Sequence, residues 1–245
     1  MRFYGISDIG LVRQSNQDCY MITTNENNDT LAMVLDGVGG SKSGDVASNM
    51  TARFINDEFI KCPELKEDKM VLMWIKKTVN AANDFIVSMA KSKAQYQGMG
   101  TTFVATLFCS AGTYVINVGD SRAYLLNETG LTKITKDHSL VEVLIDQGVI
   151  RPEDGFNHPQ RNVLINAIGI ENKIKIDIFN ISQSYQKMLL CSDGLHGYIS
   201  DDSITKIIKQ KKSIQAISNE LIAKANETGG FDNTTIVMIE VLDHD

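Results

Sequence analysis

Residues 31–40 have the sequence LAMVLDGVGG, in which five apolar residues lead to Asp36 and a glycine. Residues 187–194, KMLLCSDG, repeat this pattern and place Asp193 before a glycine. Short apolar runs that end at Asp-Gly are typical of strands followed by tight turns. Both stretches therefore predict buried strands, each with a carboxylate at its end.

Other segments extend this pattern along the chain. Further strands are predicted where apolar residues alternate or cluster, over residues 2–7, 19–24, 101–109, 113–118, 121–126, 174–181 and 234–241. Helices are predicted by apolar residues three or four apart, over residues 44–59, 71–89 and 214–225. Because strands and helices do not alternate strictly, the order favours an α+β fold with mostly antiparallel sheets flanked by helices.

The domain organisation is predicted to be simple. A chain of 245 residues suits one large domain or two small ones, and the sequence contains no internal repeat or low-complexity tract. Residues 138–169 contain Pro152, Gly155 and Pro159 and have weak periodicity. We interpret them as a helical surface flap of a single domain that covers residues 1–245.

Composition excludes several classes of function. The chain has 30 acidic and 24 basic residues, a net charge of −6, so a nucleic-acid backbone is not an expected partner. No apolar run is long enough to span a bilayer, and the N-terminus lacks the apolar region of a signal peptide. The four cysteines are scattered and form no CxxC pair. We therefore expect a cytoplasmic protein with reduced thiols and no membrane partner.

Aspartates at strand ends are the candidate functional residues. Besides Asp36 and Asp193, Asp232 follows the GGF of residues 229–231, and Asp120 follows an apolar strand. If these carboxylates converge, two of them 4 Å apart repel by about 4 kcal/mol at an effective dielectric of 20. Oxygen-only groups select hard cations such as Mg²⁺ or Mn²⁺, and paired ions are a known means of hydrolysing phosphate esters. Each Asp-Gly pair can equally be an ordinary turn.

Rival chemistries fit the sequence less well. A phosphate-binding P-loop requires glycine immediately before its lysine, but Ser41 precedes Lys42. None of the cysteines has an arginine six positions later, as a cysteine phosphatase would need. The histidines show no metal-ligand spacing, and we expect structural or surface roles for all of them, at positions 138, 158, 196 and 244.

Eight motifs together resemble one family. The chain is similar to the bacterial branch of the metal-dependent protein phosphatase 2C (PPM) family of serine/threonine phosphatases. The motifs follow the family's order: 10–18 GLVRQSNQD, 36–40 DGVGG, 98–102 GMGTT, 118–122 VGDSR, 137–140 DHSL, 158–162 HPQRN, 191–194 CSDG and 230–233 GFDN.

The resemblance implies a fold and a metal centre. The fold would be a four-layer α-β-β-α sandwich with the metals in a cleft between the sheet edges. Asp36 resembles the carboxylate that bridges two Mn²⁺ or Mg²⁺ ions, and Gly37 resembles the carbonyl ligand of one ion. Asp193 and Asp232 match the ligands of the other ion. In such enzymes a hydroxide bridging the ions attacks phosphorus.

The resemblance also implies roles for residues around the ions. Asp18 resembles an outer-shell acid, and Asp120 matches the residue that holds a third, weaker ion together with Asp193. Arg13 resembles the phosphate-binding arginine, whose planar guanidinium can bind two phosphoryl oxygens. Arg122 is expected to pair locally and to support the turn at Asp120.

The sequence departs from the family pattern at three positions. Ser41 stands where a histidine is common, and Asp45 stands where glutamate is frequent. Neither position is a metal ligand in the family, so we expect activity to survive. Val38 occupies the position of the animal relatives' candidate general acid. The leaving alkoxide would then have to take its proton from metal-bound water.

The sequence thus predicts a monomeric, metal-dependent serine/threonine protein phosphatase in signalling. Its substrates would be phosphorylated proteins, and its functional counterpart a bacterial serine/threonine kinase. One alternative is a pseudophosphatase or binding module that keeps the fold without the chemistry. Another is a phosphatase that acts on a regulatory partner-switching protein.

Overall fold

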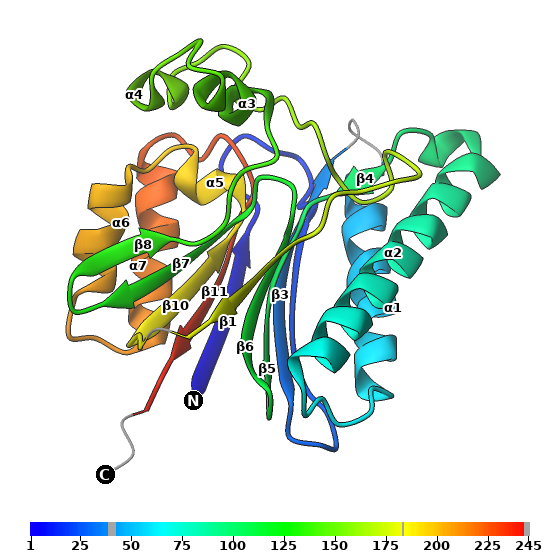
Figure 1. The fold of residues 1–245 in the computed structure, drawn as a ribbon. Helices are drawn as coiled ribbons and strands as arrows, with labels where there is room; N and C mark the ends of the chain where they lie inside the picture. Colours follow the sequence, from blue (N-terminus) through cyan, green and yellow to red (C-terminus); the bar gives the residue numbers. More distant parts are fainter. Residues whose placement is uncertain (39–42, 183, 243–245) are drawn as a thin grey trace.

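A computed structural model describes residues 1–38, 43–182 and 184–242. The glycine turn that includes Gly39 and Gly40, the departure at Ser41 and the expected role of His244 lie outside these ranges. Two antiparallel sheets face each other, and helices cover the outer face of each sheet (Figure 1). The order of layers is therefore helix, sheet, sheet, helix, as the resemblance implied.

Each sheet combines strands that are distant in sequence. Sheet 1 has the order β1 (Arg2–Asp8), β11 (Thr234–Glu240), β10 (Lys187–Cys191), β7 (Arg122–Asn127) and β8 (Gly130–Lys133). Sheet 2 has the order β2 (Asp18–Thr24), β3 (Thr30–Val38), β5 (Phe103–Cys109), β6 (Gly112–Val118) and β9 (Asp177–Ile181), and β4 (Gly100–Thr101) pairs with the end of β3.

The helices lie outside the sheets or at one edge. Helices α1 (Gly44–Ile60) and α2 (Asp68–Ser92) cover sheet 2, and a short 3₁₀ turn, η1 (Ala94–Tyr96), follows α2. Helices α6 (Asp201–Ile208) and α7 (Ile214–Glu227) cover sheet 1, and α5 (Asp193–His196) follows β10 directly. Figure 1 shows α3 (Leu140–Asp146) and α4 (Pro152–Gly155) above the sheet edges.

Strand alternation divides the core into three apolar layers. In β3, Leu31, Met33 and Leu35 point toward α1 and α2. Ala32 and Val34 point to the opposite side and pack between the two sheets. This is the period of two expected of a strand, and because both faces of β3 are covered, its sequence is a continuous apolar run.

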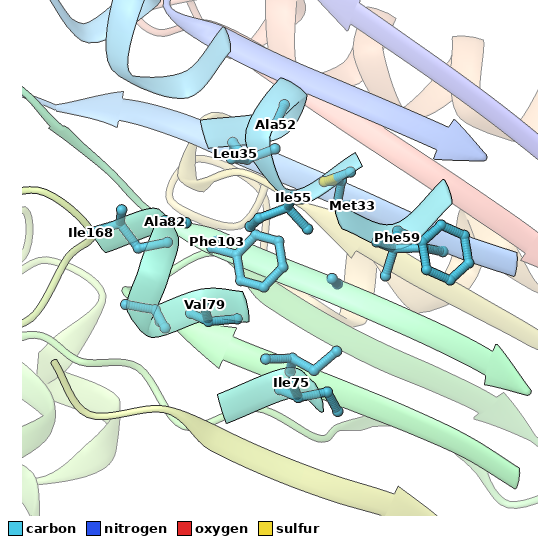
Figure 2. Close-up of a cluster of buried hydrophobic side chains, with 14 of the residues drawn as sticks. Met33, Leu35, Ala52, Ile55, Phe59, Ile75, Val79, Ala82, Phe103 and Ile168 are labelled. Carbon is cyan, nitrogen blue, oxygen red and sulfur yellow. The ribbon is translucent and has the colours of Figure 1, made fainter. Parts of the chain in front are cut away.

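The layer between sheet 2 and its helices contains the bulkiest side chains. Figure 2 shows Phe103 of β5 in this layer with Ile55 of α1 and Val79 of α2 near it, and with Phe59 of α1 and Ile75 of α2 further away in the same layer. These side chains are almost completely buried. Burial of aliphatic and aromatic groups on this scale supplies about 1.5–3 kcal/mol per side chain, and it fixes α1 against the sheet.

The observed elements differ from the predictions at a few places. The prediction of one strand over 101–109 is wrong, because Thr102 interrupts it and binds the backbone of Asp36 on β3. The strand predicted over 174–181 begins only at Asp177, because the backbone of Lys175 is hydrogen-bonded to the side chain of Asn166. Strand β8 was not predicted, since it is short and of mixed polarity.

The flap is helical, as predicted, and both of its ends are anchored. At its start, His138 N donates to the Gly119 carbonyl at 2.9 Å. At its end, Ile168 and Thr101 form an isolated antiparallel bridge. No helix among the described residues has both the length and the apolar character needed to cross a membrane.

Removing the ring at the centre of this layer should destabilise the fold. We expect Phe103→Ala to lower the free energy of unfolding by about 3–5 kcal/mol, because it leaves a cavity where Phe103 is 1% exposed. Met73 lies on the outer face of α2 and is 63% exposed, so Met73→Ala should change the same quantity by less than about 0.5 kcal/mol. Urea denaturation measures both, and equal losses would contradict this account of the core.

Candidate active site

The end of β3 is held by its neighbour across the sheet. Thr102 Oγ1 accepts a hydrogen bond from Asp36 N at 2.9 Å, and Thr102 N donates to the Asp36 carbonyl at 2.8 Å. Gly37 N donates to the Gln17 carbonyl at 3.2 Å. A Cβ at Gly37 would collide with the Gly44 carbonyl at the start of α1. Glycine is therefore required for the helix to approach the Asp36 turn so closely.

A second close approach brings two more aspartates together. Asp193 begins α5 directly after β10, and Asp232 precedes β11. A Cβ at Gly194 would collide with the Asn233 carbonyl oxygen, so only glycine lets these two chain segments touch. The charge of Asp232 acts on Asp193, as expected for neighbouring carboxylates.

Asn233 joins this pair of segments to the N-terminal loop. Its side-chain Nδ2 donates to the carbonyls of Ile9 (2.9 Å) and Ser15 (3.1 Å), and its Oδ1 accepts from Gln17 N at 2.8 Å. The side chain is 4% exposed. Asn233 is not among the residues predicted for the site, although its place beside Asp232 in the GFDN motif is a usable signal.

Arg13 lies in the loop that Asn233 holds. Its Nη2 donates to Asp232 Oδ2 at 2.7 Å, and its side chain is 48% exposed. Burial lowers the pKa of Arg13, but the nearby charges of Asp232, Asp193 and Asp36 outweigh this and raise it. The predicted phosphate-binding arginine thus contacts one of the predicted metal ligands, Asp232, and is affected by the charges of two others.

Like charges accumulate around Asp36. Burial raises the pKa of Asp36 well above its ordinary value, and the charges of Asp18, Asp193 and Asp120 raise it further. A hydrogen bond between the Asp36 and Asp193 side chains also raises the pKa of Asp36. Although Asp36 and Asp193 keep some exposed surface, the surrounding protein atoms are dense enough to disfavour their charged forms.

Asp18 and Asp120 are the most enclosed members of this cluster, each 7% exposed. Burial raises the pKa of Asp18 to about 7, although Ser192 Oγ opposes the shift by donating to Asp18 Oδ2 at 2.7 Å. Burial also raises the pKa of Asp120, and the charges of Asp193 and Asp137 add to the effect. The cluster thus has too little positive charge of its own to balance the negative charge of its carboxylates.

The donor set fits a hard cation, since every candidate side-chain ligand is a carboxylate. Within the described ranges, no group of three or more His, Cys, Asp or Glu side chains is arranged to hold an ion as it stands. Arg13 forms an ion pair with Asp232 instead, and Asp36 and Asp193 are close enough for each to shift the pKa of the other.

The turn at Asp120 has its own ion pair. Arg122 Nε lies 3.0 Å from both carboxylate oxygens of Asp137, and Arg122 Nη2 lies 2.6 Å from Asp137 Oδ2. The expected local pairing of Arg122 is therefore confirmed. His196 Nε2 is 3.0 Å from the Asp120 carbonyl, and His138 pairs with Asp177 at 3.0 Å. These two histidines have the structural roles predicted for them.

A recess of about 610 Å³ lies between the flap and this edge of the sheets, bordered by Asp120 and Asp193. Arg161 of the flap donates to the Gly197 carbonyl and lies 4.9 Å from the ring centre of Tyr198. The flap is thus joined directly to the segment that follows α5.

The Arg122–Asp137 pair should contribute a pH-dependent part of the stability. Burial acts to raise the pKa of Asp137, but the charge and hydrogen bonds of Arg122 and the charge of Lys133 lower it overall. A lowered pKa means that the stabilisation is present above the ordinary pKa of aspartate and is lost as pH falls through the folded-state value. Arg122→Gln should therefore lower the free energy of unfolding by about 3 kcal/mol at pH 7, because Asp137 stays buried with only the longer contact to Lys133, at 3.5 Å, among its described ion pairs.

Urea denaturation at a series of pH values measures this effect. The difference between wild type and Arg122→Gln should shrink as pH falls below about 4, when Asp137 becomes protonated. Arg151, whose ion pairs with Glu153 and Asp154 are exposed, provides the control, and Arg151→Gln should change stability by less than about 1 kcal/mol. A pH-independent difference would show that the pair acts through packing alone.

Comparisons with known proteins agree with this fold and these motifs. A family model described as "Protein phosphatase 2C" matches residues 12–228. The serine/threonine phosphatase stp of Listeria monocytogenes is 38% identical over 235 residues, which cover 96% of this chain and 93% of that protein.

Two solved structures have the same architecture. The crystal structure of serine/threonine phosphatase Stp1 from Staphylococcus aureus matches with a TM-score of 0.93 and 32% identity, over 98% of this chain and 95% of that one. The Mycobacterium tuberculosis serine/threonine phosphatase PstP/Ppp matches with a TM-score of 0.86 and 32% identity, over 99% of each chain. The resemblance inferred from eight motifs and the predicted fold class are confirmed.

Proposed function

The chain belongs to the protein phosphatase 2C family and is a serine/threonine phosphatase, and we propose that its reaction depends on divalent cations held by the carboxylates described above. Its substrates are proteins that carry phosphoserine or phosphothreonine. The observation that supports metal dependence most directly is the cluster around Asp36, where burial and neighbouring carboxylates raise the pKa. Cations would remove the repulsion that the cluster otherwise contains.

Two ions, Mn²⁺ or Mg²⁺, are assigned to this cluster. Asp36, the Gly37 carbonyl, Asp193 and Asp232 would hold them, and Asp120 would hold a third, weaker ion together with Asp193. When bound, such ions acidify the attacking water and neutralise charge that develops on the phosphoryl oxygens. The oxygen-only donor set favours these metals over zinc.

Arg13 is proposed to bind and orient the phosphoryl group. Its side chain is half exposed, and its one ion pair with a described residue is between Nη2 and Asp232. The planar group has further N–H donors that can reach two phosphoryl oxygens at once. Asn233 binds the backbone carbonyls of Ile9 and Ser15 and so fixes the loop that carries Arg13. The arginine is thereby held near the proposed cation ligands.

Asp18 is proposed to orient the attacking water. Its carboxyl group is buried beside Asp36, with which it pairs in register between β2 and β3. Ser192 Oγ donates to the Asp18 carboxylate and accepts a hydrogen bond from Thr235 N. The position of Asp18 is therefore fixed by both sheets. A fixed carboxylate acceptor holds a water in one direction.

The cellular setting belongs to the same proposal. A bacterial serine/threonine kinase would be the functional counterpart, since the reaction reverses transfer of phosphate to serine or threonine. The enzyme would act in signalling, as a cytoplasmic monomer. The family resemblance supports this assignment.

Removal of divalent cations should abolish turnover. We expect protein treated with EDTA and then dialysed to hydrolyse p-nitrophenyl phosphate at background rate, because its carboxylates alone cannot supply the chemistry assigned to the ions. Addition of Mn²⁺ or Mg²⁺ should restore the rate, whereas addition of K⁺ at the same ionic strength should not. Full activity after chelation would refute the proposed metal dependence.

Exchange of one proposed ligand should separate this mechanism from thiol chemistry. Asp193→Asn removes a charge with little change in shape, and we expect kcat to fall by more than about a hundredfold. Loss of a residue that only supports a metal ligand costs up to about a hundredfold in activity, and loss of the ligand itself should cost more. Cys191 lies two residues earlier and is completely buried, with its pKa raised by burial. Cys191→Ala should keep most of the activity, and the reverse result would indicate a cysteine nucleophile.

A further inference from the structure

A second recess lies on the side of the active site away from the flap helices. It has a volume of about 870 Å³ and runs between the C-terminal end of α2 and residues 169–173, which follow the flap. In Figure 1 the end of α2 and the chain after the flap both lie beside β4. Val87 and Ala90 contribute apolar surface, and Lys91, Lys93 and Lys173 contribute charge. We call this recess the basic groove.

The walls of the basic groove are joined by a buried side chain. Asn83 of α2 is 1% exposed, and its Oδ1 accepts from Gly169 N at 2.8 Å. Its Nδ2 donates to the Glu171 carbonyl at 2.9 Å. Gly169 has a φ of +89°, and a Cβ there would collide with Ile86. Residues 169–171 are thus fixed against α2, and the groove exists before any ligand binds.

The chain segment that lines one end of the basic groove leads through β4 to the end of β3. Gly98 lines the groove and lies two residues before Gly100, which pairs with Val38 at the end of β3. The next residue, Thr101, donates from its Oγ1 to the Asp36 carbonyl at 2.9 Å. One end of the groove therefore lies near the end of β3, the strand that carries Asp36.

The charge of the groove is not neutralised by neighbouring carboxylates. Among the described residues, no ion pair involves Lys91, Lys93 or Lys173, although Glu171 also lines the groove. Lys91 Nζ reaches only the amide oxygen of Asn172, at 3.5 Å. The chain as a whole has a net charge of −6, so this excess of positive charge is local.

Helix energetics explain only part of this arrangement. Lys91 is in the last turn of α2, where a positive charge is favourable for the helix dipole. Lys173 belongs to a different segment, 82 residues after Lys91, and gains nothing from that helix end. Its position across the groove from Lys91 and Lys93 places positive charge on both walls.

We propose that the basic groove binds an acidic segment of the phosphoprotein substrate, next to the residue that is dephosphorylated. This inference rests on the proposed function. Lysine side chains cover apolar surface with their methylene chains and present ammonium groups to carboxylates, so the groove suits an extended peptide that carries Asp or Glu. The phosphoryl group occupies the active site, while the acidic segment supplies selectivity between substrates.

The test compares matched peptides on matched variants. Two phosphothreonine peptides differ only in a run of four glutamates, which are glutamines in the second peptide, and the run is placed on either side of the phosphothreonine in turn. The groove variant is Lys91→Gln/Lys93→Gln/Lys173→Gln. The control variant is Lys206→Gln/Lys209→Gln/Lys211→Gln, which removes the same charge at α6, on the opposite side of the molecule (Figure 1).

Wild type should prefer the acidic peptide in kcat/KM by about tenfold for one placement of the run, as expected from three exposed ion pairs. The preference should appear as a lower KM for the acidic peptide, and it should decrease with added salt. The groove variant should lose most of it, and the control variant should keep it. No preference in wild type, or equal loss in both variants, would overturn the proposal.

Two further measurements distinguish other outcomes. p-Nitrophenyl phosphate is too small to reach the groove, so inactivity of metal-loaded wild type toward it would refute the proposed function rather than the groove. Sedimentation of wild type and groove variant detects self-association. If wild type is a dimer and the groove variant is a monomer, while both have the same peptide preference, the groove holds a second copy of this acidic chain. The proposal is then wrong.

Discussion

Carboxylates of like charge must be held side by side at the edge where the two sheets meet, and the rest of the structure depends on how this is done. Two charged carboxylates 4 Å apart repel by about 4 kcal/mol at an effective dielectric of 20. The chain offsets this cost with close backbone contacts that fix the ends of the strands. Gly194 touches the Asn233 carbonyl, Gly37 touches that of Gly44, and Thr102 binds both backbone groups of Asp36. The carboxylates are therefore carried by segments that cannot separate to relieve their repulsion.

The apolar layers make such rigidity possible. Strand β3 is covered on both faces, by α1 and α2 on one side and by the facing sheet on the other. Strand β10 is similarly enclosed, with Leu189 and Cys191 toward the helices and Leu190 toward the facing sheet. Because these strands are fixed along most of their length, only their last residues need polar contacts. The packing of the core thus stabilises the fold enough to tolerate the repulsion between the carboxylates of the site.

How far the sequence predicts this structure depends on the range of the interactions involved. Asp36 and Asp193 could be assigned to strand ends because apolar runs before Asp-Gly reflect local structure and burial. The convergence of these residues came from the family resemblance, since nothing in local sequence says which strand ends meet. Thr102 and Asn233 act through contacts with residues more than 60 positions away. A break at Thr102 inside an apolar run carries no local signal, so one long strand was predicted there.

Selectivity cannot arise within the site itself. In the proposed mechanism the carboxylates and Arg13 contact only the phosphoryl group and the water that attacks it, and every phosphoserine or phosphothreonine substrate presents the same group. Discrimination therefore requires contacts with the rest of the substrate. We assign this role to two surfaces, the flap on one side and the basic groove on the other, and both are anchored near the strand ends of the site. A rigid centre for the reaction, with separate surfaces for recognition, allows substrate preference to change without disturbing the packing that holds the carboxylates together.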